Sequence, residues 1–116
     1  MEKERQLLKD TDPSVVSNTA LKVFRRITEE WGLSEQEKFQ LLGVSSSSDI
    51  VISKKTLERI SYVLGIYKNL RILFPTQQQA NSWIKKPNAG FDGESALSVM
   101  MRDPSIVRRY LDGQLI

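Results

Sequence analysis

The residue types that most often carry enzyme chemistry are missing from this sequence. Its 116 residues include no histidine and no cysteine. The commonest general base, the thiol nucleophile and the usual transition-metal ligands are therefore absent. Serine, lysine and carboxylate side chains remain, but they form no recognisable catalytic constellation, so an enzyme built on them is the weaker alternative. The sequence predicts a protein that acts by binding, with no catalytic residue, no metal and no cofactor.

Length and composition predict a small cytoplasmic domain. Hydrophobic residues make up 40% of the chain and charged residues 27%, an ordinary balance for a globular protein. No apolar run approaches the roughly 20 residues needed to span a bilayer, so no membrane is expected among the partners. The charged N-terminal segment lacks the apolar stretch of a secretory signal.

Charge is distributed unevenly along the chain. Residues 29–49 hold five acidic side chains against one lysine, whereas residues 53–86 hold seven basic side chains against one glutamate. Solvated helix faces explain both stretches. The net charge of +3 is only a mild argument for an anionic partner.

The N-terminal half predicts two helices. An amphipathic helix begins at Pro13, after an Asp N-cap, and ends near Gly32. Its apolar face comprises Val16, Ala20, Val23, Phe24, Ile27 and Trp31. Ser34 and Glu37 then form a capping box for a second helix that ends at Gly43.

A long helix from Ser53 to about Phe74 is the expected centre of the fold. Its apolar residues spread over an arc of roughly 200° at 100° per residue. They are Leu57, Ile60, Val63, Leu64, Ile66, Tyr67, Leu70, Leu73 and Phe74. The remaining, polar side is assigned to Glu58, Ser61, Gly65, Lys68 and Asn69. Such a wide apolar arc must be covered from two directions, by the N-terminal helices and the C-terminal ones, or in part by a dimer partner.

Short capped helices follow the long one, which Pro75 ends. The capping residues are Thr76, Ser95 and Asp103. Residues 86–93 form a loop by composition, with a buried-looking Phe91. The final helix carries Ile106, Val107, Tyr110 and Leu111, and Gly113 is expected to end it, leaving residues 114–116 as a tail. No strand is convincing, so the predicted class is all-α.

Two stretches carry a resemblance to a known family. They run from Leu57 through Trp83 to Asn88, and from Phe91-Asp92-Gly93 to Asp112. Over residues 54–114 the chain resembles the toxin-binding domain of Xre/MbcA/ParS antitoxins, the partners of RES-domain toxins. A weaker likeness to the family's Xre-like helix-turn-helix region covers Ala20 to Ser45. The resemblance implies a compact helical protein with an arm (1–12), a degenerate helix-turn-helix-like region (13–52) and a toxin-binding region (53–116), the last two sharing the long central helix.

The resemblance also implies a function. RES-domain toxins degrade NAD or use it to ADP-ribosylate a target, and the antitoxin docks on the toxin and keeps substrate out of its active site. The docking residues would be Trp83, Asn88, Phe91, Arg102, Arg108, Arg109, Tyr110, Gln114, Leu115 and Ile116. For Trp83 and Phe91, packing in the core is the favoured alternative to docking. For Arg108 and Arg109, a solvated helix face is an equal alternative. For Leu115 and Ile116, a free tail competes with insertion into the toxin.

DNA binding is the alternative function, as a helix-turn-helix regulator that controls its own operon. After Gly43 the family continues with a recognition helix that bears basic and aromatic residues, but this chain continues with four serines and an aspartate. Those side chains attract phosphate weakly, which argues against specific operator binding. The candidate DNA contacts are Ser46, Ser47, Lys54, Lys55 and Arg59. A homodimer, or a hetero-oligomer with the toxin, is the expected assembly.

Overall fold

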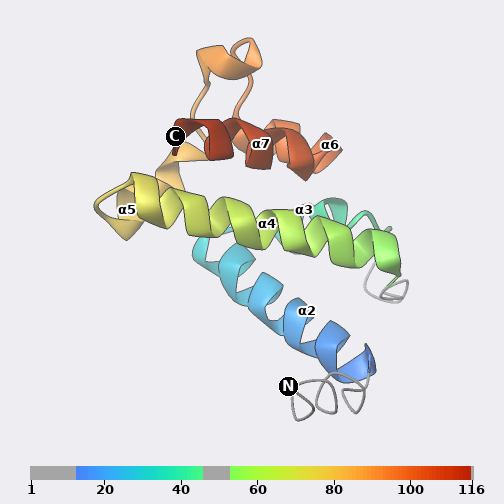
Figure 1. The fold of residues 1–116 in the computed structure, drawn as a ribbon. Helices are drawn as coiled ribbons and strands as arrows, with labels where there is room; N and C mark the ends of the chain where they lie inside the picture. Colours follow the sequence, from blue (N-terminus) through green and yellow to red (C-terminus); the bar gives the residue numbers. More distant parts are fainter. Residues whose placement is uncertain (1–12, 46–52, 116) are drawn as a thin grey trace.

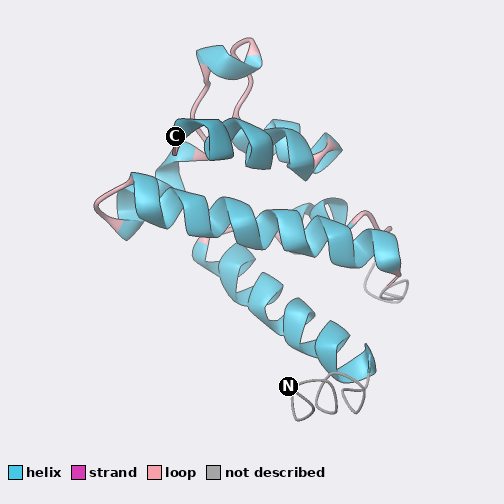
Figure 2. Cartoon of the chain, viewed as in Figure 1, coloured by secondary structure: helices cyan, strands magenta, loops and turns pink. Residues whose placement is uncertain are grey.

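The computed structural model describes residues 13–45 and 53–115, which fold into helices joined by short turns (Figure 2). The α-helices are α2 (Pro13–Glu30), α3 (Glu35–Leu42), α4 (Lys54–Leu73), α5 (Gln77–Trp83), α6 (Ala96–Arg102) and α7 (Pro104–Gln114), with a 3-10 helix η2 (Ala89–Phe91). Among the described residues, extended pairing is limited to an isolated bridge between Pro87 and Ser95. The all-α prediction is confirmed.

Helix α4 lies at the centre, with α2 on one side and α7 on the other (Figure 1). Helices α3 and α5 also contact it. The predicted cover from two directions is therefore confirmed. It leaves Tyr62 and Ile72 exposed and Leu64 only half-buried.

One hydrophobic core joins the two halves of the chain, because side chains from every α-helix meet around α4. Its largest buried members are Phe24, Trp31, Leu41, Ile60, Ile66, Leu70, Ile84, Met100 and Leu111. Each such side chain contributes about 1.5–3 kcal/mol by leaving water. The region that resembles the toxin-binding domain therefore shares one hydrophobic core with the N-terminal helices.

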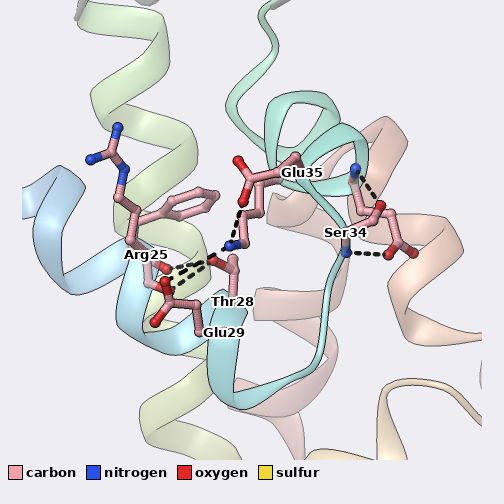
Figure 3. Close-up of polar contacts among 8 residues, drawn as sticks. Arg25, Thr28, Glu29, Ser34 and Glu35 are labelled. Carbon is pink, nitrogen blue, oxygen red and sulfur yellow. Dashed lines mark hydrogen bonds and ion pairs between the residues drawn. The ribbon is translucent and has the colours of Figure 1, made fainter. Parts of the chain in front are cut away.

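The corner between α2 and α3 is built from the predicted capping signals (Figure 3). Ser34 N–H donates to Oε1 of Glu37 over 2.8 Å, and Glu37 N–H donates back to Oγ of Ser34 over 3.1 Å. Lys38 Nζ lies 3.0 Å from the carboxylate of Glu35 and 4.0 Å from that of Glu29. Gly43 ends α3 in the left-handed conformation, with φ 77°. The capping bonds fix the start of α3, and the ion pair between Lys38 and Glu29 joins α3 to α2.

Two sequence predictions, one about α7 and one about α4, were wrong. Gly113 does not end α7: the helix continues to Gln114, and Leu115 forms the C-cap with its N–H bonded to the carbonyl of Asp112. A helix-ending glycine usually takes a positive φ, and Gly113 does not. Gly65 and Asn69, assigned to the polar side of α4, are buried where α7 covers them.

Candidate functional site

Four aromatic side chains meet where α4, α5, η2 and α7 come together. The ring centroids of Phe91 and Tyr110 are 4.8 Å apart, and Trp83 stacks on Tyr110 at 6.3 Å with 17° between the planes. Phe74 adds a tilted contact to Trp83 at 6.4 Å. Phe91 is buried, whereas Trp83 and Tyr110 are half-buried. Three of the predicted docking residues thus form a packed cluster with partly exposed edges.

The segment from Pro87 to Ser95 projects from the helical body beside α7 (Figure 1). Asn88 organises it, since its Oδ1 accepts from Gly90 N–H over 2.8 Å and its own N–H donates to the carbonyl of Glu94 over 3.0 Å. A Cβ at Gly90 would lie 2.8 Å from the Tyr110 ring, so only glycine lets the ring close on this segment. Asn88 therefore acts on the shape of the loop.

Arg102 is held in a bidentate ion pair with Glu94. Its Nη1 and Nη2 lie 2.7 Å and 2.9 Å from the two carboxylate oxygens. The hydrogen bond from this guanidinium lowers the pKa of Glu94 and raises the pKa of Arg102. The pair ties the end of α6 to the projecting segment, and both side chains remain substantially exposed.

Arg108 fastens α7 to α4. Its guanidinium lies against Gly65, where any Cβ would overlap it, and its Nε donates to Asp112 over 3.0 Å. Asn69, which is 4% exposed, donates to the same carboxylate oxygen over 2.7 Å. The hydrogen bonds from Asn69 and then from Arg108 lower the pKa of Asp112. Arg108 therefore has a packing role.

Arg109, its neighbour in the sequence, points elsewhere. It is exposed and makes long hydrogen bonds within its own helix, 3.3 Å and 3.4 Å to the side chain and carbonyl of Ser105. It also interacts electrostatically with the carboxylate of Asp103, whose pKa is lowered mainly by the Ser105 hydrogen bond and in smaller part by Arg109. Ile106 lies one turn earlier and is 42% exposed, whereas Val107 and Leu111 of the same helix are buried. Gln114 and Leu115, further along, are also exposed. The structure thus separates the two arginines that the sequence left equivalent.

The candidate DNA contacts fall into three groups. Lys54 and Lys55 are exposed at the start of α4. Arg59 instead donates to the carbonyls of Leu41 over 2.6 Å, Gln40 over 3.1 Å and Met101 over 3.0 Å, which joins the ends of α3 and α6. Burial lowers the pKa of Arg59. Ser46 and Ser47 lie outside the described residues, as does the docking candidate Ile116.

Sequence reasoning missed several residues of this region. Gly65, Asn69, Glu94 and Asp112 were not singled out, yet each holds an arginine or a helix in place. A glycine in the middle of a long helix is a readable signal, because it costs about 1 kcal/mol relative to alanine. Asp112 stands four residues after Arg108, which is also a readable pairing distance. Arg102 and Glu94 are eight residues apart and meet only because the chain turns between them, so their spacing in the sequence does not reveal the ion pair.

Within residues 13–45 and 53–115, no helix is long and apolar enough to cross a membrane. The same described part of the chain holds no cluster of three acidic side chains that could bind a metal ion. Its C-terminal region consists of helices that expose aromatic edges, an arginine and aliphatic side chains. Such a surface is typical of a module that binds another protein.

Comparisons with known proteins define the class of that module. The family model described as the antitoxin Xre/MbcA/ParS C-terminal toxin-binding domain matches residues 69–114, from the last turn of α4 to the end of α7. The chain is also 41% identical over 106 residues to uncharacterized protein y4oB of Sinorhizobium fredii (strain NBRC 101917 / NGR234), covering 81% of this chain and 82% of that protein. No solved structure matches.

The chain therefore belongs to the Xre/MbcA/ParS antitoxin family, and its residues 69–114 match that family's toxin-binding domain. A protein toxin is the partner that this domain implies.

Proposed function

We propose that this protein is an antitoxin that binds a RES-domain toxin, one that degrades NAD or transfers ADP-ribose, and blocks its active site. The observation that carries the proposal is the coincidence of the matched toxin-binding domain with the exposed side of α7 and the aromatic cluster. Aromatic and arginine side chains are common anchors in protein interfaces.

The shape and charge of this region support occlusion as the mechanism. The projecting segment and α7 lie together at one side of α4, away from α2 (Figure 1). Arg109 can donate to carboxylates or main-chain carbonyls at the rim of a substrate cleft. A rigid helical surface seated on that rim would exclude NAD without any chemistry by the antitoxin.

Co-expression with a RES-domain toxin, sought first in the reading frame beside this one, tests the proposal. The antitoxin should co-purify with that protein and suppress NAD loss in a cell-free translation reaction that makes the toxin. The mass of the complex would then give the stoichiometry. Absence of both the complex and the suppression would contradict the proposal and favour the DNA-binding alternative, which predicts strongly salt-dependent binding to duplex DNA.

A further inference from the structure

Three residues of α7 form one outward strip: Ile106, Arg109 and Gly113. They are separated by three and four residues, so they lie on one side of the helix at 100° per residue. All three are exposed. Val107 and Leu111, on the opposite side, are at most 1% exposed. The strip is therefore a distinct face, separated from the core by the helix itself.

Gly113 is the most informative member of the strip. It is the last residue but one of α7 and has no positive φ, and nothing lies within 4 Å of the place where a Cβ would be. The folded chain therefore gives no steric reason for glycine here and no positive φ that would require it, although glycine is a poorer helix former than alanine. At Gly65 and Gly90, by contrast, a side chain of this protein fills the space. A helical glycine that faces open space suits close approach by the backbone of another molecule.

Arg109 and Ile106 indicate which chemical groups the bound molecule would present to the strip. Arg109 makes hydrogen bonds no shorter than 3.3 Å within its own helix, and its charge also acts on the nearby Asp103. Its side chain is exposed, so its remaining donors can reach a carboxylate of a partner. Ile106 is 42% exposed and presents an aliphatic surface one turn away. The strip therefore presents an apolar side chain, a cation and an uncovered stretch of backbone along α7. A partner that binds it needs an apolar group, an anion and a closely approaching backbone in the same order.

We infer that this strip is the surface on which the toxin packs, and that the matching toxin element has three features. An apolar side chain meets Ile106, a carboxylate meets Arg109, and a close-packed backbone segment lies over Gly113. This inference rests on the proposed function and adds the residues that determine specificity. All three residues lie within the matched toxin-binding domain, which places the strip in the part of the chain that the family uses for its partner.

Substitution of Gly113 separates binding from folding. Gly113→Leu adds bulk to open space and improves helix propensity, so stability to urea should stay the same or rise. The same change should weaken inhibition of the RES-domain toxin by at least about tenfold, as expected at a central contact. A merely structural role for Gly113 would move stability and leave inhibition unchanged.

Charge and polarity changes on the strip complete the test. Arg109→Glu and Ile106→Asp should each weaken inhibition, measured as the antitoxin concentration that halves NAD loss. The matched controls are Arg25→Glu and Val23→Asp on α2, where the side chains are also exposed and outside the matched domain. The controls should stay within about twofold of the unchanged protein, because they lie away from the strip.

The outcomes distinguish this inference from the proposed function. If the unchanged protein inhibits and all three strip variants inhibit equally well, the strip is not the docking surface, while the antitoxin function stands. If the unchanged protein does not bind the RES-domain protein, the proposed function and this inference both fail. Selective loss of inhibition in folded strip variants supports both.

Discussion

Helix α4 is packed against α2 and against α7 by different kinds of interaction. On the α2 side apolar contacts predominate: Phe24 and Ile27 are buried, and the rings of Trp31 and Tyr67 lie 6.3 Å apart. A hydrogen bond between Tyr67 and Glu30 lies beside them and raises the pKa of Tyr67. On the α7 side, polar groups supplement the apolar contacts. Arg108 lies over Gly65, and Asn69 bonds to Asp112.

The two contacts therefore contribute differently, one mainly to the stability of the fold and the other to the orientation of α7. Apolar burial is strong but non-directional, so the α2 contact mainly provides stability. Hydrogen bonds and a glycine notch depend on geometry, so the α7 contact fixes the rotation of α7 about its axis. That rotation decides that Arg109, and not Arg108, faces outward. Breaking the two sides should therefore have different consequences.

The largest expected effect comes from the apolar side. Phe24→Ala should lower the free energy of unfolding by about 3–5 kcal/mol, because it removes a ring that is only 1% exposed. Urea unfolding followed by circular dichroism measures this. The neighbouring Val23→Ala is the control, and its 38% exposure predicts a loss below about 1 kcal/mol. Equal losses at the two positions would show that the α2 contact is misplaced.

A smaller effect is expected on the polar side. Asn69→Asp places a second carboxylate beside Asp112 and removes the donor between them, so unfolding should become easier by about 1–3 kcal/mol at pH 7. The loss should diminish as pH falls, because protonation of one carboxyl relieves the repulsion. Asn18→Asp, at an exposed position of α2, is the control and should change little. A loss that does not depend on pH would contradict the contact.

The glycine notch predicts a coupled pair of substitutions. Gly65→Ala alone should give less than the helix-propensity gain of about 1 kcal/mol, because the new methyl group displaces Arg108. In the Arg108→Ala background the same change should stabilise by about that amount. A double-mutant cycle in urea measures the coupling. Additive effects would show that Arg108 does not lie over Gly65.

The pH dependence of Asp112 is the smallest predicted effect. Its pKa is lowered in the folded chain, so its contribution to stability is present above the unfolded pKa of about 3.9. The contribution is lost as pH falls through the lower, folded value. Asp112→Asn should therefore destabilise at pH 7, and its difference from the unchanged protein should shrink below about pH 3.9. A difference that stays constant down to pH 2.5 would contradict this linkage.

The same contrast explains what could be predicted from the sequence. Helix positions and the α2 contact follow from apolar spacing and capping residues, as Phe24, Ser34 and Ser53 illustrate. These signals act over a few residues, so a single sequence contains them. The two-sided cover of α4 followed from its wide apolar arc.

The α7 contact could not be predicted, because Gly65 and Asn69 look like solvent-facing residues on a helical wheel. Their burial depends on groups more than 40 residues away in the sequence, the guanidinium of Arg108 and the carboxylate of Asp112. Choosing between Arg108 and Arg109 required the rotation of α7, which those contacts set. The family resemblance located the binding region but did not indicate which of its residues face outward.

Hydrogen exchange of the antitoxin, alone and with the RES-domain protein, tests the central claim most directly. Toxin docking on the C-terminal domain predicts slower exchange of the backbone amides in α7, residues 104–114, and in the projecting segment 87–95. Exchange in α2 should change little. Protection confined to α2 and α3, with α7 unchanged, would contradict the claim that this antitoxin binds its partner through the outward face of α7.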